Sequence, residues 1–339
     1  MQRGTTHGDS NATRSQTFGA VPPAAIGYGE EGSEPRGSDR FRSRKTLIAA
    51  NGVALEVTIA ASLRTLETSA GTSDPAPILI CLHGGGCNGR YFDIPGHSLL
   101  DVASEHGLTG VSIDRPGYGR SASCEGDYDG MSRSAEVIDG ALAVLWKESP
   151  AGCPGFVVVG HSIGGAIALH LAAADHEWPL LGVSVAGIGH IPPGNAGGAW
   201  AGATPEGGRI DIPREARRLL LYGPDWTMPT VPDNYFDAAM EPALVAELAE
   251  VYTSWLAEFS TIARRVKVPV QFAQPEFDAL WTVQPSTCHE FGSAFTQAAT
   301  VTGGIYRGVG HCIDHHRLGT AWHFEQIAFA MRCAMEARR

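Results

Sequence analysis

One serine of the chain has the surroundings of a catalytic nucleophile. Ser162 is the centre of a Gly-x-Ser-x-Gly motif that lies between a run of β-branched residues and an alanine-rich stretch with a helical pattern. In a strand, sharp turn and helix, this motif exposes the serine hydroxyl at the end of the strand. Free N–H groups at the start of the helix would face the same hydroxyl. The pattern predicts a nucleophile that attacks a carbonyl carbon; a Gly/Ser turn without chemistry is the alternative interpretation.

A base and an acid for this serine follow later in the chain, each just beyond an expected strand. His311 lies in the loop after the last strand, where a general base is needed. Asp278 lies after strand 268–273 and would fix the imidazole and stabilise its charged form. Glu276 in the same turn is the alternative acid. Ligands of open parallel sheets bind outside the carboxyl ends of the strands, so these side chains are expected to converge there.

A run of glycines supplies candidate donors for an oxyanion. Gly84, Gly85 and Gly86 follow the apolar run 78–82, and their backbone can approach a substrate closely. We expect N–H groups of Gly85 and Gly86 to bind the oxyanion together with the N–H of Ile163. A flexible turn or a phosphate-binding loop is the alternative, but a phosphate loop would contain Gly-Lys-Ser/Thr, and no lysine is present here.

Other titratable residues near these motifs are expected to have structural roles. Asp114 follows strand 109–113 in a Pro/Gly turn, where aspartate commonly accepts local backbone N–H groups. His315 and His316 are interpreted as surface or packing residues. The motifs His-Glu-x-x-His and Cys-x-x-Cys are absent, so neither a catalytic nor a structural zinc site is expected. The chemistry described requires no cofactor and no metal.

The elements that must position these residues alternate along the chain. A hairpin is predicted around Asn51-Gly52, with strands at 46–50 and 53–60. Further strands are expected at 78–82, 109–113, 156–159, 181–186, 268–273 and 304–306, and helices at 98–106, 132–146, 164–174 and 321–336. Alternating strands and helices predict the α/β class, with a mostly parallel central sheet that has helices on both faces.

Two segments depart from this alternation. Residues 1–44 are rich in Gly, Ser, Thr, Arg and Pro and are expected to form a disordered or loosely packed tail. Residues 190–265 are far longer than a usual crossover and contain helical patterns, which predicts a helical cap or lid. The α/β core would then consist of residues 45–189 and 266–339.

Aromatic residues of this insertion and its surroundings suggest the character of the substrate. Tyr235, Phe236 and Trp226 lie in the insertion, and most of its aromatic residues are expected to pack against the sheet while a minority line the pocket. Trp281 and His161, next to the acid turn and the nucleophile, complete the candidate substrate-binding set. A medium-sized apolar acyl group fits this composition better than a highly charged substrate.

The overall composition excludes several function classes. The 339 residues are 43% hydrophobic and 18% charged, as in an ordinary globular enzyme. The net charge of -11 argues against binding to nucleic acid or an anionic membrane. No apolar run is long enough to span a bilayer, and no secretory signal is evident. Seven scattered cysteines fit buried thiols in a reducing compartment, so a cytoplasmic location is expected. The oligomeric state is not indicated.

The order Ser162, Asp278, His311 is that of the α/β-hydrolase triad. From about Thr46 to the C-terminus the chain resembles the α/β-hydrolase fold superfamily, in its serine-nucleophile branch with a helical cap. The landmarks are His83-Gly84-Gly85-Gly86, Asp114-Arg115-Pro116-Gly117-Tyr118-Gly119-Arg120-Ser121, Gly160-His161-Ser162-Ile163-Gly164-Gly165, the Asp278 turn and Gly310-His311. Gln274-Pro275 stands where many members have His-Gly, so both Asp278 and Glu276 remain open as the acid.

The resemblance implies a serine hydrolase that cleaves a carboxylic ester or thioester of a small-molecule acyl substrate through an acyl-serine intermediate. The same triad also serves C–C bond hydrolysis, lyase, acyl-transfer or cyclisation chemistry in biosynthesis. A ligand-binding protein with little turnover is the third alternative, because a fold does not fix a function.

Overall fold

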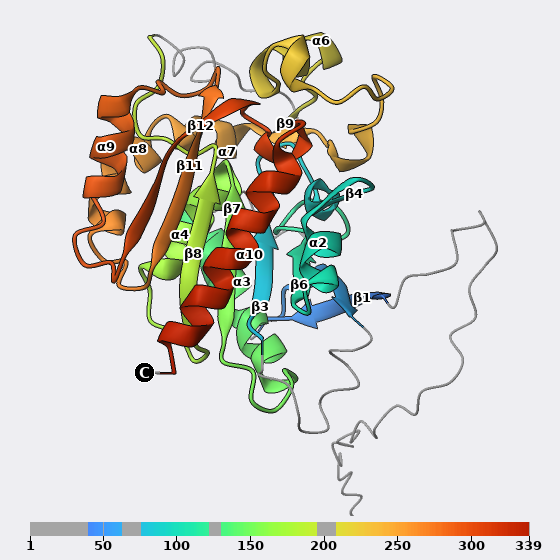
Figure 1. Cartoon of the computed structure of the whole chain (residues 1–339), viewed down its shortest axis with the longest axis vertical. Coiled ribbons are helices and arrows are strands. Elements are labelled where there is room, and N and C mark those ends of the chain that lie inside the picture. The colour runs from blue at the N-terminus through green and yellow to red at the C-terminus, as the bar shows by residue number, and fades with distance from the viewer. Residues whose placement is uncertain (1–39, 50, 63–75, 122–129, 195–207, 339) are drawn as a thin grey trace, which may run out of the picture. The chain divides into compact units, whose positions relative to one another are not determined.

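The protein is described from a computed structural model, which places residues 40–49, 51–62, 76–121, 130–194 and 208–338. Its centre is an eight-stranded sheet of order β1-β2-β6-β3-β7-β8-β11-β12 (Figure 1). The strands are β1 (Arg40–Ile48), β2 (Ala54–Ser62), β3 (Ile78–Leu82), β6 (Thr109–Ile113), β7 (Phe156–His161), β8 (Leu180–Ala186), β11 (Val270–Phe277) and β12 (Val301–Gly310). All neighbours from β6 to β12 pair in parallel, whereas β1 and β2 are antiparallel.

Helices cover both faces of the sheet. α2 (Leu99–Glu105) and α10 (Gly319–Glu336) lie on one face, and α3 (Gly130–Lys147) and α4 (Ile163–Ala172) lie on the other (Figure 1). α9 (Pro285–Ser293) packs beside the edge strand β12. The mostly parallel sheet with helices on both faces, expected from the sequence, is confirmed.

The strand β3 shows why the central strands are apolar throughout. Ile78, Ile80 and Leu82 belong to the core between the sheet and α3/α4, whereas Leu79 and Cys81 belong to the core on the α2/α10 side. Successive side chains of a strand point to opposite faces, so a strand covered on both sides needs apolar residues at every position. This explains why residues 78–82 are apolar at every position.

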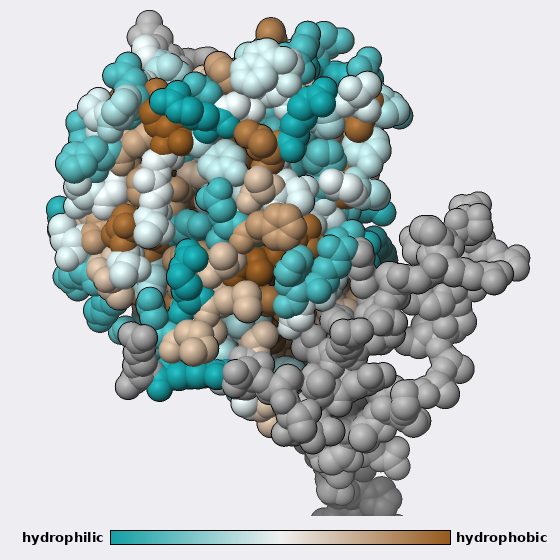
Figure 2. All heavy atoms as spheres, viewed as in Figure 1, coloured by the Kyte–Doolittle hydropathy of each residue, from teal (hydrophilic) through white to brown (hydrophobic). Residues whose placement is uncertain are grey.

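The face of the molecule that carries α10 is mixed in character (Figure 2). Polar residues predominate there, and apolar residues are scattered among them (Figure 2). The exposed large apolar side chains of α10 are Phe324, Met331 and Met335. Within the described residues, no helix is long and apolar enough to cross a membrane.

The described part of the insertion between β8 and β11 contains three α-helices. It contains α6 (Arg214–Leu221), α7 (Val245–Val251) and α8 (Ser254–Ala263), together with short 3-10 turns and the small β9/β10 pair (Arg209–Ile210 and Ala243–Leu244). α7 and α8 are separate helices, since the chain turns at Tyr252 and Thr253. Residues 195–207 of the insertion lie outside the described residues.

The N-terminal strand begins earlier than the sequence indicated. β1 starts at Arg40 and pairs with β2 along its whole length, although residues up to 44 were expected in the tail. Its Arg42 contacts the carboxylates of Asp93 and Asp101 at 2.6 and 2.7 Å. Charged residues suit an edge strand because they discourage pairing with another chain. The rest of the expected tail, residues 1–39, lies outside the described residues.

Candidate active site

Ser162 occupies the sharp turn between β7 and α4. Its φ of 52° makes it the one non-glycine residue with positive φ in the part of the chain that the structure describes. Such a conformation costs free energy and persists only where the surroundings impose it. A side chain on Gly160 or Gly164 would collide with the backbone of the helix or of the β3 end. The glycines of the motif therefore allow the close approach of strand and helix that holds the serine in this turn.

His311 follows β12 and contacts a buried carboxylate. Its Nδ1–H donates to Oδ2 of Asp278 at 2.9 Å, and both side chains are almost completely buried. Asp278 lies just beyond β11, so two adjacent strand ends bring the pair together. The proton on Nδ1 leaves Nε2 as the acceptor nitrogen of the neutral ring.

Glu276, the alternative acid, is engaged elsewhere. Its carboxylate accepts hydrogen bonds from Arg307 at 3.1 Å and from the N–H of Gly308 at 2.8 Å. These partners hold it at the surface of the β11–β12 edge. Of the two carboxylates in this turn, the structure therefore brings only Asp278 to His311.

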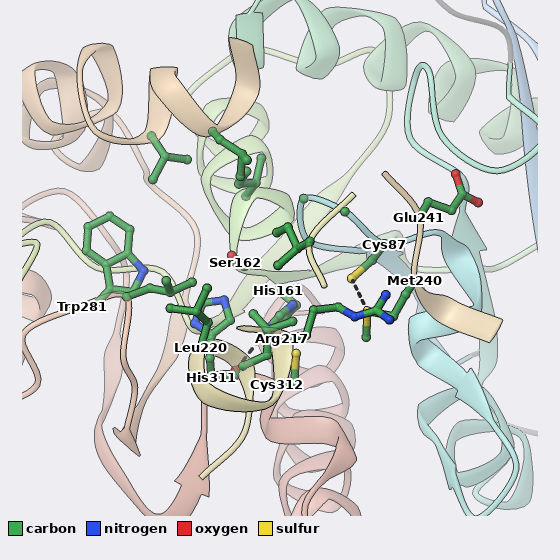
Figure 3. A pocket seen from close by; sticks show the side chains of 18 of the residues that line it. Cys87, His161, Ser162, Arg217, Leu220, Met240, Glu241, Trp281, His311 and Cys312 are labelled. Carbon is green, nitrogen blue, oxygen red and sulfur yellow. Dashed lines mark hydrogen bonds between the residues drawn. The ribbon is translucent and has the colours of Figure 1, made fainter. Parts of the chain in front are cut away.

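One pocket contains Ser162, His311 and the glycine loop (Figure 3). Ser162, His311, Gly85, Gly86 and Ile163 all line it. Its remaining wall is mostly apolar and includes Ile212, Leu220, Leu221, Met240, Leu248, Val251, Leu280 and Trp281. Several of these belong to α6 and α7, so the insertion forms part of the wall above the strand ends.

The candidate oxyanion donors differ in their availability. Ile163 is the first residue of α4, and its N–H has no acceptor within the helix. The N–H of Gly86 points to the hydroxyl of Tyr118 at 3.5 Å. Gly85 lies beside the Ile163 side chain, and both residues line the pocket. This arrangement favours Gly85 and Ile163 over Gly86 as a donor pair.

Buried groups that the sequence did not single out hold the glycine loop. Arg115 donates to the carbonyl oxygens of His83 at 2.7 Å and Gly84 at 3.1 Å, and it pairs with Glu247 from α7. The Tyr118 hydroxyl donates to Glu247 at 2.7 Å. Arg115 and Glu247 are both completely buried. Sequence reasoning missed this pair because Arg115 and Glu247 lie 132 positions apart in the chain.

The expected substrate-binding residues are divided between the pocket and the packing around it. His161 and Trp281 line the pocket. Tyr235, Phe236 and Trp226 are not part of the pocket wall that the structure describes. The hydroxyl of Tyr235 donates to Pro95 at 2.6 Å, Phe236 stacks on His315, and Trp226 is 64% exposed against Phe277.

The neighbouring histidines are buried and structural. His316 accepts N–H groups from Gly310 at 2.9 Å and Gly223 at 3.1 Å, which joins the end of β12 to the insertion. Burial lowers the pKa of His316 to about 4 and the pKa of His315 to about 3. Of the two roles expected from the sequence, both residues take packing rather than a surface position.

Asp114 has the structural role expected of it. Its carboxylate accepts hydrogen bonds from the N–H groups of Gly89 at 2.7 Å and Arg120 at 3.0 Å.

The six described cysteines are free, and Cys87 and Cys312 line the pocket. Burial raises the pKa of Cys87 to about 12, so its thiol stays protonated and is a poor nucleophile. Among the described residues, no group of three or more metal-ligating side chains is placed to hold a metal ion.

Curated proteins similar to this chain include protein phosphatase methylesterase 1. The mouse protein is 29% identical over 114 residues, and the bovine protein is 27% identical over the same length. These matches cover 32% of this chain and only about a quarter of the relatives, 26% of the mouse protein and 27% of the bovine one.

Solved structures share the fold over most of the chain. An esterase from Thermogutta terrifontis has a TM-score of 0.60 at 15% identity and covers 85% of this chain and 99% of its own. A carboxyl esterase from Bacillus coagulans has a TM-score of 0.60 at 17% identity, over 86% and 99% of the two chains. The thioesterase domain from the curacin biosynthetic pathway has a TM-score of 0.53 at 14% identity, over 86% and 99%.

A family model supplies the broader assignment. The model described as the alpha/beta hydrolase family matches residues 79–320, which is more than half of the chain. This range contains the serine turn, the glycine loop, the acid turn and the histidine loop. The chain belongs to the alpha/beta hydrolase family.

Proposed function

We propose that the protein hydrolyses a carboxylic ester or thioester of a medium-sized, largely apolar acyl group through an acyl-serine intermediate. The observation that carries the proposal is the convergence of Ser162 and the Asp278–His311 pair on one pocket with the glycine loop. The mostly apolar wall of that pocket supports an apolar acyl group.

In the first half of the reaction, Nε2 of His311 accepts the proton of Ser162 while the serine oxygen attacks the carbonyl carbon. Asp278 fixes the Nδ1–H tautomer and stabilises the imidazolium. The N–H groups of Gly85 and Ile163 bind the oxyanion, and removal of one such donor costs about 3 kcal/mol of transition-state stabilisation in comparable sites. The alcohol or thiol leaves with a proton from His311.

In the second half, His311 takes a proton from water, and the resulting hydroxide equivalent attacks the acyl-serine ester. The tetrahedral intermediate then collapses, the serine oxygen leaves with the proton from His311, and the acid is released. The bond changes use groups of this chain, the substrate and one water, and the proposed mechanism calls for no cofactor.

The test is a panel of p-nitrophenyl esters and acyl thioesters of two to ten carbons, assayed with the wild type and with Ser162→Ala. We expect hydrolysis with a maximum at intermediate chain length, and its loss in Ser162→Ala while the circular dichroism spectrum is unchanged. Retained hydrolysis in the variant would show that Ser162 is not the nucleophile. If the wild type binds these compounds and turns none over, the protein is a ligand-binding member of the family.

A further inference from the structure

Among the described residues of the insertion, one cationic side chain lines the pocket. Arg217 lies on α6 and lines the pocket together with Ser162 and His311. Its side chain extends toward Met240, among the residues that line the pocket (Figure 3). The side chain is only 18% exposed. An arginine is always charged, and burial against apolar residues makes an unneutralised guanidinium costly.

The donors of Arg217 are largely unused. Within the described residues its guanidinium forms one ion pair, with Asp237 at 3.5 Å, which is too far for a good hydrogen bond. Asp237 also accepts a hydrogen bond from Arg214, one turn earlier on α6. One carboxylate therefore serves two guanidinium groups, and this cluster retains a positive charge. No hydrogen bond joins the Arg217 guanidinium to any residue that the structure describes.

Arg115 provides a comparison inside the same protein. Its guanidinium donates to two carbonyl oxygens and to both oxygens of Glu247. This is how the fold satisfies an arginine that has a purely structural position. Arg217 has five N–H groups in the same fork geometry, and the described residues do not supply it with such a set of acceptors. Its donors are therefore available to a ligand in the pocket.

The acid that lines the pocket does not neutralise Arg217. Glu241 accepts hydrogen bonds from the Asn88 side chain at 2.8 Å and from the N–H of Gly119 at 3.0 Å. Its carboxylate points away from the pocket (Figure 3). The surrounding wall is apolar, and a charge pair in such surroundings is stronger than one in water.

We propose that Arg217 forms an anion subsite, and that the substrate carries a carboxylate in addition to the bond that is cleaved. The inference rests on the proposed hydrolysis and narrows its substrate class to esters or thioesters with one carboxylate at a distance from the scissile carbonyl. A guanidinium binds a carboxylate through two parallel hydrogen bonds. One cation matches the single charge of a carboxylate better than the double charge of a phosphate monoester.

The first test compares matched pairs of substrates. The p-nitrophenyl monoesters of succinate, glutarate and adipate are each paired with the neutral ester of equal carbon number, butyrate, valerate and hexanoate. A second series places the carboxylate on the leaving group, as in 4-acyloxybenzoates against 4-acyloxytoluenes. We expect the wild type to prefer at least one anionic series by about tenfold or more in kcat/KM, the effect of hydrogen bonds to a charged group.

Variants assign this preference to the residue. Arg217→Met keeps an unbranched side chain without the charge and should bring the kcat/KM of each anionic ester to about that of its neutral partner. Arg217→Lys keeps the positive charge but not the planar set of donors, and it should retain part of the preference for the anionic ester. Arg214→Met is the matched control, because Arg214 also contacts Asp237 but does not line the pocket. Equal preference in the wild type and Arg217→Met would overturn the proposal.

A binding experiment separates this proposal from the proposed hydrolysis. Ser162→Ala is titrated calorimetrically with methyl hydrogen glutarate and with methyl valerate, and the titration is repeated in Ser162→Ala/Arg217→Met. The subsite predicts tighter binding of the glutarate ester in the first protein and equal binding in the second. This difference without turnover in the wild type would uphold the subsite and reject the hydrolase; equal binding in both proteins would reject the subsite alone.

Discussion

The Nε2–H group of His161 donates to the backbone carbonyl oxygen of His311 at 3.0 Å. The residue next to the nucleophile thus holds the loop of the proposed base. The loop is held from its other side as well, because the N–H of Gly310 donates to His316 at 2.9 Å. Burial lowers the pKa of His161 to about 3, so its ring remains neutral and keeps one donor nitrogen. This hydrogen bond therefore positions the His311 loop relative to Ser162, which follows His161 in the chain.

Replacement of His161 should reduce catalysis more than folding. His161→Phe keeps the stacking on Tyr91, whose ring centroid is 4.3 Å from that of His161, but removes the donor to His311. We expect kcat to fall about fivefold, which corresponds to one neutral hydrogen bond. His161→Gln, which keeps a side-chain N–H, should recover part of this loss. Steady-state kinetics with melting temperatures checks this, and an unchanged kcat in His161→Phe would mean that the hydrogen bond does not position the base.

The two carboxylates of the acid turn should differ greatly in effect. Asp278→Asn keeps the shape but favours the wrong tautomer of His311, so kcat should fall by about 10⁴. Glu276→Gln removes a charge that contacts Arg307 and Gly308. Because such partly exposed ion pairs contribute little, kcat should change less than about twofold. Steady-state measurement of kcat for both variants tests this ranking, and the reverse ranking would assign the acid to Glu276.

Removal of one partner of the buried Arg115–Glu247 pair should destabilise the protein more than replacement of both. Glu247→Ala leaves a buried guanidinium without its partner and should lower the free energy of unfolding by about 3–5 kcal/mol. The double substitution Arg115→Met/Glu247→Leu should recover most of this loss. Glu136→Ala, which removes an exposed pair with Arg133, is the control and should cost less than about 1 kcal/mol.

Urea unfolding monitored by fluorescence measures these energies. A loss in Glu247→Ala no larger than that in Glu136→Ala would contradict the importance of the buried charge. Hydrolysis by the double variant, measured beside its stability, then tests whether the carbonyls of His83 and Gly84 need Arg115 to keep the glycine loop in place.

The buried histidines should make the protein less stable in mild acid. Burial lowers the pKa of His161 and His315 to about 3 and that of His316 to about 4, whereas histidine in an unfolded chain titrates near 6.5. Between these values the unfolded state binds more protons than the folded state. The free energy of unfolding should therefore fall as the pH falls from about 6.5 to about 4, by about 1.4 kcal/mol per pH unit for each histidine.

His315→Phe provides the check on this slope. A phenylalanine can keep the stacking on Phe236, whose ring centroid lies 4.5 Å from that of His315, and it takes up no proton. Urea titrations at several pH values should give a slope that is smaller by about one proton in the variant. A slope equal to that of the wild type would show that His315 does not titrate on unfolding.

Local patterns were sufficient to predict the parallel sheet and the strand ends after which Ser162, Asp278 and His311 lie. The strands at 78–82 and 109–113 have the bounds predicted from the sequence, because a wholly apolar run between turn residues allows few other structures. α9 was missed, although Pro285 in its first turn and the reciprocal capping of Gln284 and Thr287 mark its start.

Contacts between distant segments were beyond such patterns. The aromatic residues Trp226, Tyr235 and Phe236 suggested a pocket wall, but composition does not determine which way a side chain points from an irregular segment. The acid that neutralises Arg115 and the cation that faces the pocket both come from the insertion, whose packing depends on the complete fold. The catalytic roles of Ser162, Asp278 and His311 and the binding role of Arg217 remain predictions that chemistry must test.

The most direct test of the central claim is the reaction with a fluorophosphonate, followed by intact mass and peptide mapping. An activated serine predicts a single adduct on Ser162 in the wild type, and no adduct in His311→Ala, where the proton acceptor is missing. An adduct on another residue, an unmodified wild type, or equal labelling of Ser162 in His311→Ala would contradict the account of Ser162 as a nucleophile activated by His311.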